Sequence, residues 1–409
     1  MPIIFDYENT SLINKKELDA LVEQLKPEIA KVAQAAFMNL PHDHTMHDYI
    51  MSVVEAKKAL KPTLLLVIGI GGSNLGTLAV HEALHGIYYN QKNPALKFYC
   101  ADTIDTQRAR DLLFLVEQEL KQNNSIIIAL ITKSGTTTET LINASLFVNL
   151  LKKYKPQNYA EYLVIITDQN SPLWHVGKQE QCAVLEIPTA VGGRYSVLSA
   201  VGLFPLGLLG VDIKKLCSGA REARSDNAAI SAALLFAHYS TGKNIHDTFL
   251  FGPDLGALGA WYRQLMGESL GKLHAGITPT VSLGTVDLHS VAQLYLGGPL
   301  DKFTTFVTQT PPQELIIPAT IFADLKPVGA GKSIGSLQKA IFNGVWAAYY
   351  KEHRPFVTFD LGVITPEVLG QFLYTKMLEI VFLAHLMKVN PFDQPQVELY
   401  KKEAQKFLL

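Results

Sequence analysis

The chain has 409 residues, 48% of them hydrophobic, and a formal net charge of −1. This length suits two or three domains with large buried cores. With 36 basic and 37 acidic residues, no global field favours nucleic acid or an anionic membrane. Three scattered cysteines favour reduced thiols over a disulfide framework, and the N-terminus lacks the features of a signal peptide. We therefore expect a cytoplasmic protein with no membrane span.

Short apolar runs alternate with amphipathic stretches between about residues 61 and 200. Near-continuous apolar strands separated by helices indicate a parallel sheet covered on both faces, with its ligand crevice at the carboxyl ends of the strands. The predicted strands are residues 64–68, 95–100, 126–131, 162–167 and 183–187, and the predicted helices are residues 75–85, 105–122 and 138–154.

After Gly210 the same theme repeats more loosely. The predicted strands there are residues 248–252, 278–283, 303–308 and 356–361, and the predicted helices are 255–270, 333–353, 366–388 and 397–408. The apolar stretch 196–211 is broken by three glycines and a proline, so it predicts a buried helix. We expect an α/β protein with two doubly wound parallel-sheet domains (51–205 and 206–388), an N-terminal helical arm (1–50) and a C-terminal helix (389–409).

A glycine-rich loop, Gly69-Ile70-Gly71-Gly72-Ser73-Asn74-Leu75-Gly76, follows the first predicted strand. Glycines let a backbone approach an anion, and the following helix offers free N–H groups. A dinucleotide fingerprint would need glycine where Asn74 stands. Ligand contact and a simple packing turn both remain open for this loop.

The second loop, Thr132-Lys133-Ser134-Gly135-Thr136-Thr137-Thr138, joins a strand end to a helix start. Several hydroxyls, one lysine and a glycine at such a junction suit a phosphate group. The alternative is that Thr137 or Thr138 only caps the helix. Capping needs one hydroxyl, and this loop has five. With a single lysine, the loop predicts a monophosphate site.

Three further motifs have plainer explanations. His81-Glu82-Ala83-Leu84-His85 matches the HExxH pattern of zinc peptidases, but it lies on the helix after the glycine-rich loop and no third ligand is nearby. The polar run 42–48 could grip a metal but favours a solvated surface turn. Gly331-Lys332-Ser333 lacks the first glycine of a phosphate-binding loop, so Ser333 is expected to cap a helix.

Four later segments, together with the two loops, resemble the glucose-6-phosphate isomerase family, in family order between residues 69 and 401. They are Val191-Gly192-Gly193-Arg194-Tyr195-Ser196-Val197-Leu198-Ser199, Gln264-Leu265-Met266-Gly267-Glu268-Ser269-Leu270-Gly271-Lys272, Gly284-Thr285-Val286-Asp287-Leu288-His289-Ser290, and Asn390-Pro391-Phe392-Asp393-Gln394 with Val397-Glu398-Leu399-Tyr400-Lys401. Any one of these matches is weak, and the ordered set is specific.

The resemblance implies the interconversion of glucose 6-phosphate and fructose 6-phosphate through an enediol, a step of glycolysis and gluconeogenesis, without metal or cofactor. It implies that Glu268 is the base, that Arg194 stabilises the enediolate, and that His289 and Lys401 serve ring opening and proton shuttling. Gln264 and Gln394 would position sugar hydroxyls. The implied substrate contacts also include Gly72, Ser73, Thr132, Lys133, Ser134, Thr136, Thr137 and Gly193.

The resemblance further implies a homodimer in which His289 comes from the neighbouring subunit. Each single residue also has a structural explanation, such as a surface glutamate for Glu268 or a solvated helix for Lys401. Two other functions remain as alternatives: a sugar-phosphate sensor that binds without catalysis, and a zinc peptidase built on His81, Glu82 and His85. A sensor has no need of Glu268, Arg194, His289 and Lys401 together.

Overall fold

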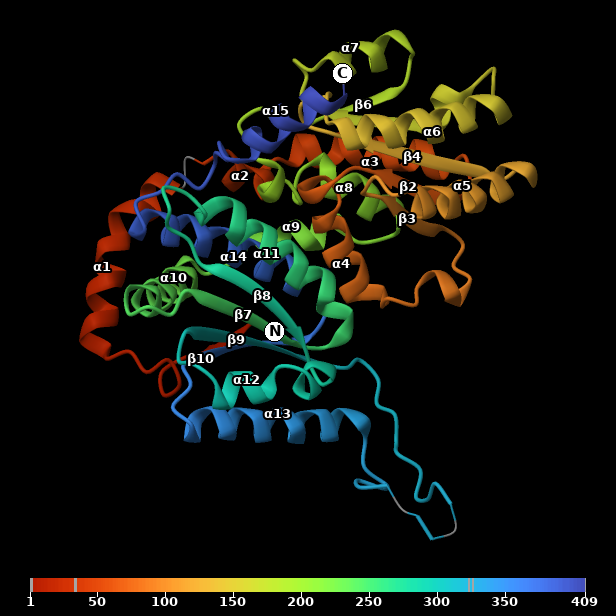
Figure 1. Cartoon of the computed structure of the whole chain (residues 1–409). Coiled ribbons are helices and arrows are strands. Elements are labelled where there is room, and N and C mark those ends of the chain that lie inside the picture. The colour runs from red at the N-terminus through yellow and green to blue at the C-terminus, as the bar shows by residue number, and fades with distance from the viewer. Residues whose placement is uncertain (1–2, 33–34, 323, 326, 409) are drawn as a thin grey trace. The chain divides into compact units, whose positions relative to one another are not determined.

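The computed structural model describes residues 3–32, 35–322, 324–325 and 327–408. Contacts group the chain into two compact units, Ala33–Arg221 and a second one that joins Met1–Val32 to Glu222–Leu409. We call them the inner unit and the outer unit, after their places in the sequence, and describe each by itself (Figure 1). The domain edges expected at residues 50, 205 and 388 stay predictions.

The inner unit is built on a parallel sheet of five strands. Side chains 64–68 in the centre of this sheet are fully buried, as expected for strands covered on both faces. In spatial order the strands are β3 (Lys97–Ala101), β2 (Pro62–Ile68), β4 (Ser125–Ile131), β5 (Leu163–Thr167) and β6 (Ala183–Glu186).

Helices cover both faces of the inner sheet. The chain moves from β2 outward to β3 and then returns past β2 to β4, so right-handed crossovers place α4 on the face opposite α5 and α6. The apolar stretch after Arg194 forms the wholly buried α8, as predicted. The helices are α2 (Ala36–Asn39), α3 (His44–Lys58), α4 (Leu75–His85), α5 (Thr106–Lys121), α6 (Thr138–Tyr154), α7 (Pro172–Gln179), α8 (Ala200–Leu208) and α9 (Ile213–Arg221).

The prediction of a solvated turn at residues 42–48 is wrong. Asp43 caps the first turn of α3 by accepting a hydrogen bond from the Met46 amide at 2.9 Å. His47 is 3% exposed, and its Nε2 lies 2.8 Å from the Leu40 carbonyl oxygen. These polar residues therefore form the start of a helix, and the buried His47 side chain hydrogen-bonds to a backbone carbonyl.

The outer unit contains a second five-stranded sheet. Four of its strands are parallel, and the short β1, which the sequence did not predict within the N-terminal arm, pairs antiparallel with β10 at the edge. The spatial order is β8 (Thr278–Leu283), β7 (Ile245–Phe251), β9 (Lys302–Thr310), β10 (Phe356–Val363) and β1 (Ile4–Asp6).

Two groups of helices enclose this sheet, as Figure 1 shows. On one face α12 and α13 close an aromatic core that includes Phe249, Phe306 and Phe356. On the other face α10 and α11 pack against α14, which buries the ion pair of Lys376 with Glu379 at 2.7 Å. The helices are α1 (Lys15–Val32), α10 (Ser225–Ser240), α11 (Gly256–Leu270), α12 (Ala292–Gly297), α13 (Ile334–Lys351), α14 (Pro366–Leu386) and α15 (Val397–Leu408).

The two sheets share a strand order. Reading β8-β7-β9-β10 against β3-β2-β4-β5 pairs β7 with β2 and β9 with β4. The helix after β9 is α13, and the helix after β4 is α6. The fold is therefore two parallel-sheet α/β units of the same topology. Within the described ranges, every helix is too short or too polar to cross a bilayer.

Candidate active site

Three loops meet at the carboxyl edge of the inner sheet. The first follows β2, the second follows β4, and the third carries Gly193 and Arg194. The strand ends at Ile68 and Leu130 are paired, which places the first two loops side by side. A Cβ on Gly72 would lie 2.2 Å from the Gly193 carbonyl carbon, so the first and third loops touch backbone to backbone. This edge is where doubly wound sheets hold ligands.

The hydroxyls predicted to hold a phosphate form one hydrogen-bonded group. The Thr132 and Thr137 hydroxyl oxygens are 2.8 Å apart, and the Thr137 oxygen is 3.4 Å from that of Ser134. The Thr136 hydroxyl donates to the Ser134 oxygen at 3.1 Å. Four hydroxyls from a six-residue loop thus converge, an arrangement that supplies several donors to one anion.

Thr137 occupies the N-cap position of α6, yet its side chain makes no capping hydrogen bond. The alternative that this loop's threonines only cap the helix therefore fails for Thr137. The first-turn N–H groups of α6 keep their capacity to donate, and the helix dipole adds positive potential there. Gly135 has a φ of +70°, and a Cβ there would lie 2.9 Å from the Ser171 Cβ, so this turn requires glycine.

Lys133 supplies the positive charge of this loop. Burial lowers the pKa of its ammonium group, and the nearby Asp168 carboxylate opposes that shift. Burial raises the pKa of Asp168, but hydrogen bonds from Asn170 and Thr189 and the charge of Lys133 bring it below the usual value. The Asp168 amide also donates to the Lys133 carbonyl oxygen at 3.2 Å. Asp168 therefore fixes the lysine electrostatically and through the backbone.

The third loop buries Arg194, which is 2% exposed and whose guanidinium carbon lies 5.6 Å from the centre of the Tyr195 ring. Ser196 donates to the Gly193 carbonyl oxygen at 2.6 Å and reaches the Gly72 carbonyl oxygen at 3.4 Å. Gly72 thus lies against the loop that carries Arg194. For the glycine-rich loop, which the sequence left open, the packing role is now established, and the substrate role stays a prediction.

The HExxH residues lie on α4 in aromatic surroundings. His81 is 3% exposed, and its ring centre lies 4.5 Å from that of Tyr89 and 4.8 Å from that of Phe98. Burial and the neighbouring His85 lower the pKa of His81 to about 3. Across the described residues, no three His, Cys, Asp or Glu side chains are grouped to hold a metal ion. Packing accounts for both histidines.

In the outer unit, α11 places Gln264 and Glu268 one turn apart. The Gln264 side-chain amide donates to Glu268 Oε1 at 3.0 Å, which orients the carboxylate. The Gln264 Oε1 is itself buried and makes no protein hydrogen bond. The structure therefore brings together the two residues that the resemblance assigned to proton transfer and sugar positioning.

The C-terminal segment is tied to the end of α11 by Lys272, which is 7% exposed. Its ammonium group donates to the Ser269 carbonyl oxygen at 2.9 Å and to the Asn390 carbonyl oxygen, and it lies 3.0 Å from the Asp393 carboxylate. Gln394 follows Asp393 directly. Lys401 lies seven residues after Gln394, exposed on α15, and its ammonium group is 2.9 Å from the Glu398 carboxylate.

His289 ends the 3₁₀ turn Val286–His289 and is exposed. Asp287 fixes this turn: its carboxylate accepts the Leu283 amide at 2.7 Å and the Ser290 hydroxyl at 2.8 Å. Asp287, Lys272 and Asp168 are not among the functional residues predicted from the sequence. Asp168 directly follows a strand, so the rule that found Lys133 would also have found it. Lys272 is revealed only by its contacts with the distant Asn390 and Asp393, and Asp287 only by the local hydrogen bonds that the folded turn forms.

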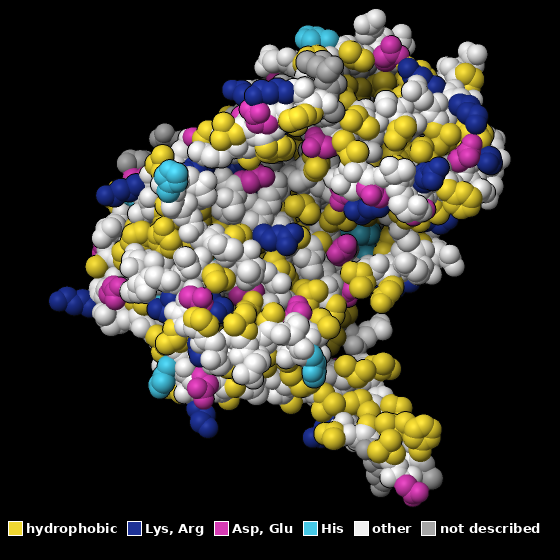
Figure 2. All heavy atoms as spheres, viewed as in Figure 1, with side chains coloured by type: hydrophobic (Ala, Val, Ile, Leu, Met, Phe, Trp, Pro, Cys, Tyr) yellow, Lys and Arg dark blue, Asp and Glu magenta, His cyan; other side chains and the backbone are white. Residues whose placement is uncertain are grey.

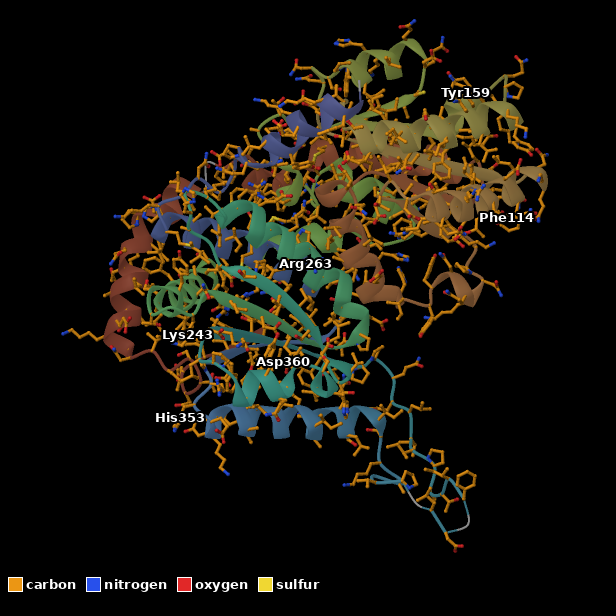
Figure 3. All side chains as sticks on the ribbon, viewed as in Figure 1. Phe114, Tyr159, Lys243, Arg263, His353 and Asp360 are labelled. Carbon is orange, nitrogen blue, oxygen red and sulfur yellow. The ribbon has the colours of Figure 1, made fainter. Side chains whose placement is uncertain are left out.

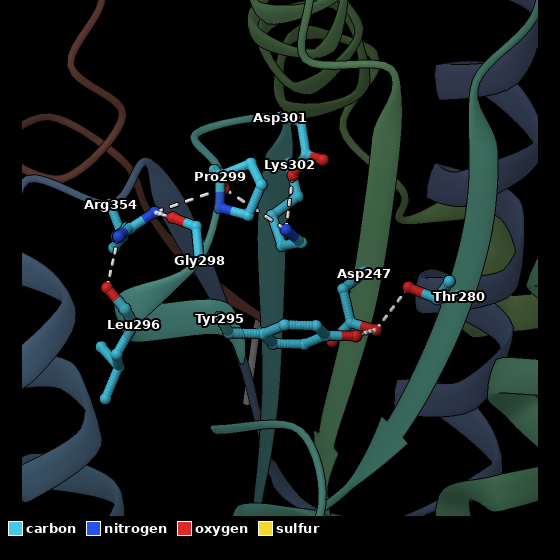
Figure 4. Close-up of polar contacts among 9 residues, drawn as sticks. All are labelled: Asp247, Thr280, Tyr295, Leu296, Gly298, Pro299, Asp301, Lys302 and Arg354. Carbon is cyan, nitrogen blue, oxygen red and sulfur yellow. Dashed lines mark hydrogen bonds and ion pairs between the residues drawn. The ribbon is translucent and has the colours of Figure 1, made fainter. Parts of the chain in front are cut away.

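A buried polar cluster anchors α12, which follows His289 closely (Figure 4). The Tyr295 hydroxyl donates to the Asp247 carboxylate at 3.0 Å, and Thr280 donates to the same oxygen at 2.6 Å. Burial raises the pKa of Asp247, and these hydrogen bonds oppose that shift. Just past Tyr295, at the C-cap of α12, Arg354 donates to the Gly298 carbonyl oxygen at 3.0 Å. The C-terminal half of α12 is therefore held by two separate contacts.

The chain is an α/β protein of two parallel-sheet units with one topology, one of which gathers four hydroxyls and a lysine at a helix start. The chain matches the Phosphoglucose isomerase family over residues 46–408. It is 33% identical to "Glucose-6-phosphate isomerase" of Carboxydothermus hydrogenoformans over 90% of this chain and 84% of the relative.

Solved structures agree on the fold. A hypothetical protein from Thermus thermophilus superposes with a TM-score of 0.86 at 27% identity, covering 99% of both chains. A glucose-6-phosphate isomerase from Chlamydia trachomatis gives 0.82 at 20% identity, covering 99% of this chain and 88% of that one. The chain belongs to the phosphoglucose isomerase family.

Proposed function

We propose that the chain is an aldose–ketose isomerase that interconverts glucose 6-phosphate and fructose 6-phosphate through an enediol. Family membership supports the reaction class. One observation supports a phosphorylated substrate: four hydroxyls and Lys133 gather at the start of α6, which has no side-chain cap. That set suits the three oxygens of one phosphate group, because hydroxyl and amide donors share them while the ammonium supplies charge.

Glu268 moves the proton between C2 and C1. A carboxylate suits this step because it takes and returns the same proton, and Gln264 holds it in one orientation. Arg194 stabilises the negative charge of the enediolate, since a guanidinium is charged at every working pH. His289 and Lys401 serve ring opening and the proton shuttle at the oxygens. Gln394 positions a sugar hydroxyl, and Gly72, Ser73 and Gly193 line the phosphate side.

We also propose that the protein works as a homodimer in the cytoplasm, with His289 acting across the subunit interface. The described part of the segment between β9 and α13, residues 311–322, 324–325 and 327–333, supports this. Figure 1 draws it as a loop that reaches away from its own sheet, and Figure 2 shows apolar side chains gathered on it. Phe322 is 71% exposed and Val328 is 93% exposed. Apolar side chains this exposed are typical of a surface that a partner covers.

The test is a coupled assay for conversion of fructose 6-phosphate, run with purified protein in excess chelator. We expect full turnover in the chelator, because every assigned step uses a side chain. Absence of turnover with and without chelator would refute the isomerase. Turnover that chelator abolishes would refute the metal-independent mechanism. Sedimentation of the same preparation measures the dimer, and a monomer with full activity would exclude His289 acting across an interface.

A further inference from the structure

A cavity of about 380 Å³ lies in the outer unit, and none of the residues assigned to the isomerase lines it. It is formed at the carboxyl ends of β7, β9 and β10 and beneath the first half of α13. Asp360, labelled in Figure 3 on β10, contributes to its wall. We call it the outer cavity. Its volume falls within the roughly 300–1,000 Å³ of small-ligand pockets, and strand ends are where such sheets bind ligands.

The outer cavity occupies the same topological place as the phosphate loop of the inner unit. The shared strand order pairs β9 with β4 and α13 with α6. In the inner unit the loop after β4 presents hydroxyls at the start of α6. In the outer unit the corresponding strand end, with Thr308 and Gln309, opens into the cavity. The fold therefore offers a second ligand position. The side chains that line the cavity determine which ligand it suits.

An anion does not suit this second position. The Glu314 carboxylate already accepts the Gly335 amide at 3.2 Å, and the Ser333 hydroxyl accepts the Ser336 amide at 3.1 Å. A Cβ on Gly335 would lie 2.6 Å from the Glu314 carboxylate, so that glycine makes room for it. With Asp360 the wall carries two carboxylates against one ammonium. A phosphate would therefore meet a filled helix start and net negative charge.

The remaining lining combines flat apolar walls with neutral hydrogen-bonding groups. The Phe251 and Phe342 ring centres lie 4.9 Å apart, at 73° to each other. Gly252 leaves space for the Gln309 amide, whose nitrogen would lie 2.3 Å from a Cβ at that position. The neutral polar lining residues are Thr308, Gln309, Thr310, Ser336, Gln338 and Asn343. Amides and hydroxyls both donate and accept, which matches hydroxyl groups on a ligand.

We propose that the outer cavity is a second binding site that takes an uncharged polyhydroxylated compound of monosaccharide size. The aromatic walls contact the carbon skeleton, and the amides, hydroxyls and carboxylates bond its hydroxyl groups. The site is distinct from the phosphate loop, and it does not depend on the isomerase assignment. Its ligand is a free sugar or sugar alcohol, since the sugar phosphates of the active site carry a charge that this cavity opposes.

The test measures binding of D-sorbitol, myo-inositol and D-glucose to the full chain by saturation-transfer NMR, with affinities from calorimetry. Asn343→Trp places an indole over the cavity from an exposed position on α13. Gly252→Ala displaces the Gln309 amide, a flexible side-chain end, without deleting it. Lys351→Gln, exposed at the last turn of α13 and outside the lining, is the matched control.

We expect at least one of the three compounds to bind with a Kd of about 1 mM or tighter. Asn343→Trp should weaken that binding by about tenfold or more, Gly252→Ala by less, and Lys351→Gln not at all. Circular dichroism confirms that each variant is folded. The proposal is overturned if none of the three compounds binds. It is also overturned if binding survives Asn343→Trp. A further contrary result would be displacement of the polyol by inorganic phosphate in the Lys133→Met variant, in which the phosphate loop of the inner unit is disabled.

Discussion

The two units share a strand order and use the corresponding helix starts in opposite ways. At the start of α6 in the inner unit, the Thr137 side chain forms no capping hydrogen bond. It belongs instead to the cluster of four loop hydroxyls, with its oxygen 2.8 Å from that of Thr132. At α13 in the outer unit, Ser333 and Glu314 occupy the first-turn amides. A helix start whose first-turn N–H groups lack acceptors attracts anions, and one whose N–H groups are already hydrogen-bonded does not. The same topology therefore leaves amide donors available at one helix start, where we propose the phosphate anchor, and occupies them at the corresponding helix start of the other unit.

The largest expected effect comes from the outer unit, through Glu268→Gln. Glutamine keeps the shape of the side chain and its contact with Gln264 but accepts no proton. We expect kcat to fall by about 10²–10⁴-fold with little change in substrate affinity. The coupled assay gives kcat, and calorimetry gives affinity. Glu352→Gln, at the exposed end of α13, is the control. An unchanged kcat would favour a sugar-phosphate sensor.

Lys133→Met tests the anchor of the inner unit and should act on KM. Removing a charged hydrogen bond to phosphate costs about 1.5–3 kcal/mol, or about 10- to 150-fold in kcat/KM. Because the proton-transfer residues are untouched, kcat should change much less. Lys58→Met is the control, since Lys58 pairs with Glu55 on the surface at 3.1 Å and such pairs contribute little. A loss confined to kcat would contradict the anchoring role.

Gly72→Ala tests whether the inner unit's loops must touch. The added Cβ would lie 2.2 Å from the Gly193 carbonyl carbon and 2.7 Å from the Arg194 amide, both backbone atoms that cannot rotate away. We expect a cost of about 1–3 kcal/mol in the free energy of unfolding, with a raised KM. Gly192→Ala is the control, because its nearest contact is an ordinary 3.6 Å. Equal stability of both variants, measured by urea denaturation, would show that the loops separate freely.

Each unit also buries a histidine, and the two should respond differently to replacement by phenylalanine. Burial lowers the pKa of His81 to about 3 from the ordinary 6.5. The unfolded chain therefore takes up this proton first, so stability falls as pH drops below 6.5 and stops falling below about 3. At pH 5 the loss is roughly 2 kcal/mol. His81→Phe should remove that loss and change little at pH 7.5, because His81 Nδ1 has no protein partner.

His238 in the outer unit provides the contrast. Burial lowers its pKa to about 4, but its Nε2–H donates to the Ser11 carbonyl oxygen at 2.7 Å. His238→Phe leaves that carbonyl unsatisfied, so it should destabilise the protein at pH 7.5 as well. Urea denaturation at pH 5 and 7.5 measures both variants. If His81→Phe lost as much stability at pH 7.5 as His238→Phe, the packing explanation for the HExxH helix would be wrong.

The sequence predicted most of the elements because their signals are local. Apolar runs marked the parallel strands, and Ser333 was recognised as a cap from its place before a helix. The short β1 was not predicted because three residues are too few to show an alternation of apolar and polar side chains. These residues form a strand only by pairing with β10, more than 350 positions away. Lys272 was not predicted for the same reason, because its partners Asn390 and Asp393 lie far along the chain. The Asp287 partners, Leu283 and Ser290, are close in sequence, but the residue types alone do not show that these hydrogen bonds form.

The smallest expected effect concerns Asp287, which holds the turn that ends in His289. Asp287→Asn keeps one oxygen as an acceptor, so a single hydrogen bond of the pair from Leu283 and Ser290 is lost. We expect a cost of about 0.5–1.5 kcal/mol. If Asp287 positions the turn that carries His289, this cost appears in kcat/KM, while the free energy of unfolding changes by less. Ser290→Ala removes the hydrogen bond from Ser290 but keeps the one from Leu283, and it serves as the comparison. A loss seen in stability alone would make Asp287 a structural residue of the outer unit, and the chemistry of that unit would then depend on α11 rather than on this turn.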